Sequence, residues 1–109
     1  MTDTVAEGWA EKELAIAREA FDRAYERAVD RLVLAVRTRS AALNSVHAVW
    51  DLHDFLSIER HTMEGRFDFQ LEGILFLFAG LVKDELLQLE ELAGLEREKL
   101  AKIAAMARF

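Results

Sequence analysis

The chain has 109 residues, a formal net charge of −6, no cysteine and no proline. The acidic balance argues against nucleic acid as a partner, because binding phosphates requires a basic surface, and the lack of cysteine excludes disulfides and thiol chemistry. With abundant Ala, Leu, Glu and Arg, and only five glycines to interrupt helices, a chain of this length predicts a single all-α domain.

Neither a signal peptide nor a membrane-spanning segment is visible in the sequence. Residues 1–7 are acidic and contain no apolar core, unlike a signal peptide. The longest apolar run, 74–82, is interrupted by Gly80 and is far shorter than the roughly 20 residues that span a bilayer. We therefore expect a cytoplasmic protein without a membrane span.

The first predicted element is a long helix over about 9–42. Thr4 and Glu7 have the spacing of a capping box, but Gly8 favours a later start. Small and apolar residues then recur every three or four positions as far as Ala35. Such a helix extends about 45–50 Å, whereas a compact chain of this size has a radius of gyration of about 13 Å. Its apolar stripe would therefore stay exposed unless a second copy covers it.

This geometry predicts an antiparallel homodimer in which the long helix packs across a two-fold axis. The expected interface residues are Phe21, Ala28, Leu32, Val36 and Leu43. In an alternative arrangement, the helix breaks within 37–40 and folds back on its own chain. Those residues are polar, but they include no glycine or proline that would force a break.

The second predicted helix starts at Asn44 or Ser45, either of which can cap it, and ends near Gly65. At about 100° per residue its side chains separate into two faces. The apolar face carries Val49, Leu52, Leu56 and Met63. The opposite face carries Trp50 among His47, His53, Asp54, Ser57, Arg60 and His61. An exposed Trp with charged neighbours is typical of a protein-recognition surface, because the indole buries a large area at little entropic cost.

The rest of the chain predicts a small head of three helices, over about 71–82, 84–93 and 96–108. Asp68 can cap the first of them, which is apolar on nearly all sides. The predicted architecture is a helical stalk over about 9–64 that dimerises and a helical head over about 66–109. Both belong to one domain, 1–109.

No catalytic or metal-binding arrangement is predicted. His53 and His61 are about 12 Å apart along one straight helix, so they cannot hold one ion together, and His61 with Glu64 would form only half of a site. Ser57 lies one turn after His53, but Asp54 points about 100° away from it and no oxyanion hole is visible. We expect no enzyme activity, no metal site and no cofactor.

The second predicted helix also resembles a family signature. Its residues Trp50, Leu52-His53-Asp54-Phe55-Leu56-Ser57, Arg60-His61 and Gly65 follow the pattern of the fluorescence recovery protein family. The similarity continues through 74–79 and 99–103 and reaches back weakly to Phe21. The resemblance covers nearly the whole chain.

This resemblance implies a function and a set of site residues. Members of the family are dimeric regulators that bind no pigment. They bind the C-terminal domain of the photoactivated, red form of the orange carotenoid protein and speed its return to the orange form, which ends quenching at the cyanobacterial phycobilisome. The location would be the cytoplasmic face of thylakoids. By the match, the partner-binding residues would be Trp50, His53, Asp54 and Arg60, with Phe76 and Lys102 as secondary contacts in the head.

Each of these residues also has a purely structural interpretation. Trp50 could pack against the head or the other protomer, and His53 could be a satisfied histidine at the edge of the core. Asp54 and Arg60 could be solvated charges on the helix face, where ion pairs contribute little. Phe76 could belong to the core of its apolar helix. Lys102 could be a solvated partner of the helix dipole. The clustering of Trp50, His53, Asp54 and Arg60 favours the functional interpretation.

Some residues depart from the family pattern. Asp51 and Glu59 stand where basic residues are expected, and His47-Ala48 replaces an acidic pair. Charge reversal beside a polar interface changes the choice of partner before it changes the fold. The alternative hypothesis is therefore a family-like dimeric interaction module with a different, unknown protein partner, in an organism that lacks the orange carotenoid protein.

Overall fold

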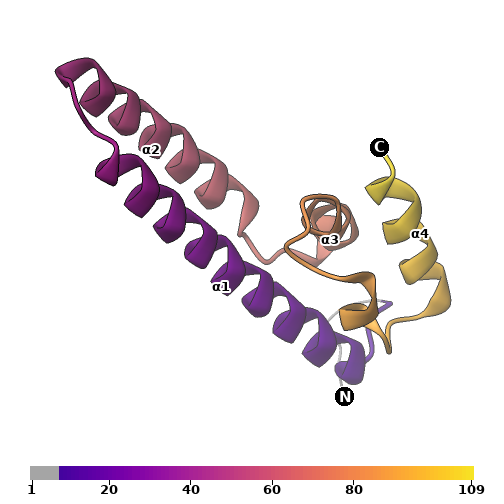
Figure 1. The fold of residues 1–109 in the computed structure, drawn as a ribbon. Coiled ribbons are helices and arrows are strands. Elements are labelled where there is room, and N and C mark those ends of the chain that lie inside the picture. Colours follow the sequence, from indigo (N-terminus) through magenta and orange to yellow (C-terminus); the bar gives the residue numbers. More distant parts are fainter. Residues whose placement is uncertain (1–7) are drawn as a thin grey trace. The chain divides into compact units, whose positions relative to one another are not determined.

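The computed structural model describes residues 8–109 and contains helices but no strand over that range (Figure 1). The capping box proposed for Thr4 and Glu7 lies outside the described residues. The helices are α1 (Glu11–Ala41), α2 (Val46–Arg66), α3 (Ile74–Lys83) and α4 (Arg97–Ala107), and two 3₁₀ turns are η1 (Leu71–Gly73) and η2 (Leu89–Leu92). The predicted all-α fold with a long N-terminal helix is confirmed. No helix among residues 8–109 combines the length and apolarity needed to cross a bilayer.

The described residues fall into two compact units. One combines 8–25 with 69–109, and the other is Glu26–Asp68. α1 therefore contributes its N-terminal turns to the first unit and its C-terminal turns to the second. The division into a dimerising stalk and a head stays a prediction, because it depends on a second copy.

The polar segment near the end of α1 does not break the helix. α1 is continuous over 31 residues, about 46 Å. The hydroxyl of Thr38 donates to the carbonyl oxygen of Leu34 at 3.0 Å, and that of Ser40 donates to the carbonyl oxygen of Val36 at 2.6 Å. These polar side chains bond to the helix that carries them, so the alternative break within 37–40 is absent.

In the second unit, α2 runs back antiparallel to the C-terminal turns of α1 (Figure 1). Ser45 is the N-cap, as predicted, and its hydroxyl accepts a hydrogen bond from the Ala48 backbone N–H at 3.1 Å. The end predicted just before Gly65 is too early, since Gly65 and Arg66 are still helical and the Phe67 N–H donates to the Met63 carbonyl. None of the residues 26–68 is buried, so the two helices by themselves form no core.

The core of the first unit lies where α3 and α4 pack together with the N-terminal turns of α1. Its fully buried large side chains are Ile74, Phe78, Leu81, Leu87, Leu92 and Ile103. α1 adds the small Ala17, Ala20 and Ala24 at three- and four-residue spacing, which lets other segments of the unit approach it closely.

Two sequence-based expectations for this unit are wrong. The predicted helix over 84–93 is only the short turn η2, because Leu86 and Leu87 turn into the core and Glu85 adopts a left-handed φ of 62°. Asp68 does not cap α3; the turn η1 intervenes, and Gly73 is the residue before α3. Over 84–93, core packing therefore overrides local helix propensity.

The first turns of α1 and α4 are joined through Glu13, which is the buried charged residue of 8–109, at 6% exposure. Its carboxylate accepts hydrogen bonds from Lys99 Nζ and the Glu96 backbone N–H, each at 2.8 Å, and from the Ala10 N–H at 3.2 Å. Lys99 Nζ also lies 3.9 Å from the centre of the Trp9 ring. Burial alone would raise the pKa of Glu13, but these hydrogen bonds and the Lys99 charge lower it.

Candidate protein-recognition surface

The outer face of α2 exposes the residues predicted to recognise a partner. Trp50 is 59% exposed, and the side chains of His53, Asp54 and Arg60 are 73%, 73% and 80% exposed. Trp50 and Asp54 are one turn apart, and His53 and Arg60 are two turns apart. One helix therefore places all four side chains on its solvent side. Because Trp50 is mostly exposed, packing within its own unit does not explain why a Trp occurs at this position.

Charged neighbours pair along this face without being buried. His53 Nδ1 lies 3.3 Å from Asp54 Oδ1, and Arg60 Nε lies 3.1 Å from Glu64 Oε2. All four side chains are at least 67% exposed, so these pairs contribute little to stability. Both pairs leave their charges exposed on the same helix as Trp50.

The two positions at which the charge departs from the family pattern differ in exposure. The side chain of Asp51 is 58% exposed, and its Oδ2 lies 3.4 Å from His47 Nε2. Glu59 is only half-buried, on the side of α2 that carries Phe55. The reversed charge on the outer face is therefore mainly that of Asp51.

The apolar face of α2 is only partly covered. Leu52 and Met63 are only half-buried, and Val49 and Leu56 remain 41% and 37% exposed, so these four residues do not form a buried stripe within the chain. The guanidinium of Arg39 lies 3.8 Å from the centre of the Phe55 ring and joins α2 to α1. An apolar strip beside this contact thus remains open to solvent.

The predicted dimer residues have different surroundings within the single chain. Ala28, Leu32 and Val36 are half-buried, and Leu43 is 36% exposed. Leu32 lies on the same side of α1 as Arg39, seven residues away, so α2 covers part of this stripe. Phe21 is 7% exposed and packs edge-to-face on a phenylalanine of its own unit, Phe69, with ring centres 5.2 Å apart. The roles of these residues in a dimer stay a prediction.

The two head residues of the predicted site, Phe76 and Lys102, are both exposed. Phe76 is 75% exposed although α3 is apolar on most sides, so the core interpretation of this residue is wrong. Lys102 is exposed on α4. Lys83, which shares the outer side of α3 with Phe76, donates a hydrogen bond to the Phe109 carbonyl.

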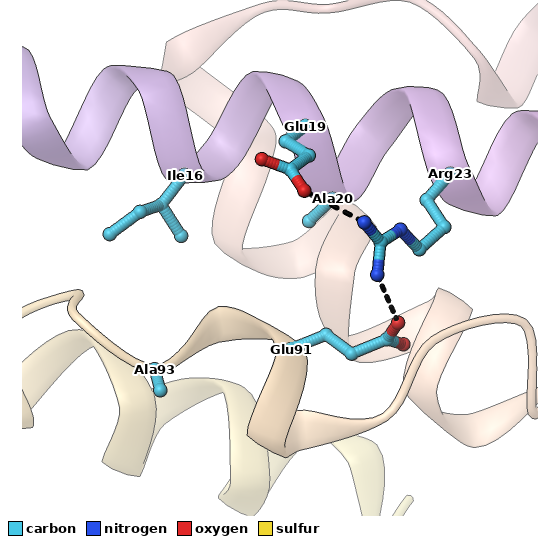
Figure 2. A pocket seen from close by; sticks show the side chains of 6 residues that line it. All are labelled: Ile16, Glu19, Ala20, Arg23, Glu91 and Ala93. Atoms are coloured by element: carbon cyan, nitrogen blue, oxygen red, sulfur yellow. Dashed lines mark hydrogen bonds and ion pairs between the residues drawn. The ribbon is translucent and has the colours of Figure 1, made fainter.

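Sequence reasoning missed a small pocket in the first unit (Figure 2). It has a volume of about 230 Å³ and is lined by Ile16, Glu19, Ala20, Arg23, Glu91 and Ala93. Arg23 Nη2 donates to Glu19 at 2.7 Å and its Nη1 donates to Glu91 at 3.4 Å (Figure 2). No sequence signal could have found it, because Arg23 and Glu91 are 68 positions apart. The single guanidinium already pairs with both carboxylates.

Clustered metal ligands are not found in the part of the chain that the structure describes. Over residues 8–109, no group of three or more His, Cys, Asp or Glu side chains is placed to hold an ion.

Comparison with known proteins gives consistent matches. A family model described as "Photoprotection regulator fluorescence recovery protein" matches residues 9–107. The Fluorescence recovery protein of Synechocystis sp. PCC 6803 is 38% identical over 108 residues, which cover 99% of both chains. Two solved structures are also similar, each covering 93% of this chain and 99% of the other: the Fluorescence Recovery Protein of Fremyella diplosiphon (38% identity, TM-score 0.89) and that of Synechocystis sp. PCC 6803 (39% identity, TM-score 0.88).

Proposed function

The chain belongs to the fluorescence recovery protein family of photoprotection regulators, and on this premise we propose that it acts by binding, without enzymatic chemistry. Its proposed partner is the C-terminal domain of the photoactivated orange carotenoid protein. Binding accelerates the return of that protein to the orange form and ends phycobilisome quenching. The observation that carries the proposal is the exposure of Trp50, His53, Asp54 and Arg60 on one face of α2.

Differential binding accounts for such an activity. A binder speeds the closure of a two-domain partner only if it holds the closing transition state more tightly than the open form. It must also bind the closed product weakly enough to leave. A rigid helix that presents an aromatic side chain and oriented charges supplies shape and charge complementarity, which are sufficient for this task.

The head contributes secondary contacts in this proposal. Phe76 offers a large aromatic surface, 75% exposed, and Lys102 offers a cation on α4. Aromatic side chains are enriched at protein interfaces, and a charged side chain at the rim steers the approach of a partner of opposite charge. The site of action is the cytoplasm, at the thylakoid surface beside phycobilisomes.

A homodimer is part of the proposal. The unit Glu26–Asp68 has no buried residue, and it leaves Val33, Val49 and Leu56 37–42% exposed. Two amphipathic helices need a further apolar surface to form a core. An antiparallel second copy provides that surface by the same residues on both protomers.

The second candidate function is an interaction module of the same architecture with a different protein partner. Asp51 favours it, because an exposed acidic side chain stands on the outer face of α2 where the family pattern is basic. A reversed charge at the rim of an interface weakens binding of the original partner by like-charge repulsion and favours binding of a partner with the opposite charge.

A back-conversion assay tests the proposal. Orange carotenoid protein is photoactivated, the dimeric protein is added in the dark, and the red-to-orange rate is followed by absorbance. We expect acceleration that is lost in Trp50→Ala and kept in Phe109→Ala, which removes an aromatic side chain that is 90% exposed elsewhere. No acceleration by the folded protein, tested with several carotenoid protein variants, would favour the different partner.

A further inference from the structure

An apolar ridge on α2 extends beyond the residues assigned to partner binding. Val46, Trp50 and Ile58 are 67%, 59% and 64% exposed. With Asp54 they follow one another at intervals of four residues, so they form one i±4 ridge about 18 Å long. Contiguous exposed apolar patches on soluble proteins often mark sites of protein–protein interaction.

The charges beside this ridge are acidic. The side chains of Asp51 and Asp54 are 58% and 73% exposed, and α2 offers no Lys or Arg before Arg60. Arg60 is paired with Glu64 at 3.1 Å. In the other direction along the chain, the nearest cation is Arg39, which is stacked on Phe55. Within residues 8–109, the bases beside the two carboxylates are His47, 3.4 Å from Asp51, and His53, 3.3 Å from Asp54.

We propose that the ridge of Val46, Trp50, Asp54 and Ile58 docks a basic amphipathic helix of a partner protein. The docked helix carries apolar side chains at i, i+4 and i+7 and Lys or Arg residues that meet Asp51 and Asp54. This inference rests on the proposed function and adds the chemistry of the segment that α2 recognises. Ridges of this spacing pack into the grooves of another helix at about −50°.

Charge complementarity selects this occupant over a second copy of the chain. A second α2 seated on the ridge by two-fold symmetry would bring its own Asp51 and Asp54 to the same place. Like charges that face each other across an interface are unfavourable. A segment with Lys or Arg at those positions instead pairs with both carboxylates.

Two matched peptides test the proposal without any carotenoid protein, so the result is independent of the back-conversion assay. Each is an 18-residue amphipathic helix with leucines on one side, flanked by Lys in one peptide and by Glu in the other. The ¹⁵N-labelled full chain is titrated with each peptide and followed by NMR. We expect the Lys peptide to shift the amides of 46–58 and to bind at least roughly tenfold more tightly, a factor consistent with two charge pairs.

Variants locate the effect. The double substitution Asp51→Lys with Asp54→Lys is expected to reverse the preference between the peptides. Asp22→Lys is the control, since its side chain on α1 is also 58% exposed and also lies in an i,i+4 ion pair, and it is expected to leave the preference unchanged. Ile58→Asp is expected to weaken the Lys peptide about tenfold while the protein stays dimeric, because one apolar anchor is lost.

Three results would overturn the proposal. The first is equal binding of the two peptides. The second is a set of shifts confined to the acidic segment 84–98, which would mean non-specific attraction to the head. The third is dissociation of the dimer by Ile58→Asp, which would assign the ridge to the second copy instead.

Discussion

Glu13 shows how a single buried charge organises the first unit. Its partner Lys99 lies 86 positions away in the sequence, and the carboxylate also accepts the N–H of Glu96, the residue that precedes α4. A buried carboxylate that lost these donors would carry a large desolvation cost. The start of α4 is therefore held to the start of α1 as long as Glu13 is ionised.

The pH dependence of unfolding follows from this arrangement. Because the pKa of Glu13 is lowered from 4.5, the unfolded chain takes up the proton more readily than the folded chain. The resulting stability is present above pH 4.5 and is lost as the pH falls through the folded pKa. Thermal unfolding between pH 7 and pH 3 should show a steeper loss in the natural chain than in Glu13→Gln. Equal slopes would mean that Glu13 does not contribute.

Gly94 is a second residue whose identity is dictated by its surroundings. Its φ is +109°, and a Cβ atom there would lie 2.4 Å from Ile16 Cδ1 on α1. We expect Gly94→Ala to lower the free energy of unfolding by about 1–3 kcal/mol, from backbone strain and crowding together. Gly73→Ala is the control, because a Cβ there meets nothing within 4 Å and its φ is −114°. The denaturant midpoints of the two variants are compared. Equal midpoints would contradict the conclusion that position 94 requires glycine.

At the scale of the element, α2 is a helix whose outer side chains are not needed to hold it in place. Trp50 is more than half exposed, and Arg60 contacts Glu64 on the same helix. Stability of α2 comes instead from the Ser45 cap and from the side that carries Phe55. Folding of α2 therefore does not constrain which residues stand on its outer side, and partner binding can determine them.

Substitutions on that side should therefore separate function from folding. Trp50→Ala and Arg60→Glu are expected to abolish action on the partner while the far-ultraviolet circular dichroism and the mass of the dimer stay unchanged. The physical reason is that neither side chain is buried in its own chain. If either variant unfolds, that residue is structural and its assignment to the partner-binding face is wrong.

At the scale of the whole molecule, the exposed apolar strip of Glu26–Asp68 points to assembly. A unit without buried residues gains little from hydrophobic burial by itself, and the second copy of the proposed homodimer would supply the missing layer. The proposed homodimer would give each assembly two copies of the α2 surface.

A charge placed in the proposed dimer interface should prevent this assembly. Val36→Glu is expected to give monomers, because an ionised side chain in an apolar interface is costly to desolvate. Leu34→Glu is the control, since Leu34 is 63% exposed and lies on a different side of α1. Light scattering coupled to size-exclusion chromatography measures both masses. If Val36→Glu is still a dimer, or if Leu34→Glu is a monomer, the dimer interface lies elsewhere than proposed.

Local sequence patterns by themselves determined α1, α2 and which face of α2 is exposed. The three- and four-residue periodicity, the Ser45 cap and the position of Trp50 opposite Leu52 depend on residues within a few turns, so α1, α2 and the exposure of Trp50 could be predicted. The family resemblance carried by the α2 residues could be recognised because those residues are contiguous in the sequence, and the match to the family model confirms it.

Only the tertiary structure decided features that depend on distant contacts. The exposure of Phe76, the turn over 84–88, and the pairing of Arg23 with Glu91 all result from how α3, α4 and η2 pack around α1. Local propensity is too weak to predict such outcomes, since burying Leu86 and Leu87 stabilises the chain more than one further helical turn would. Sequence periodicity identifies which faces are apolar, and packing determines which of them remain exposed.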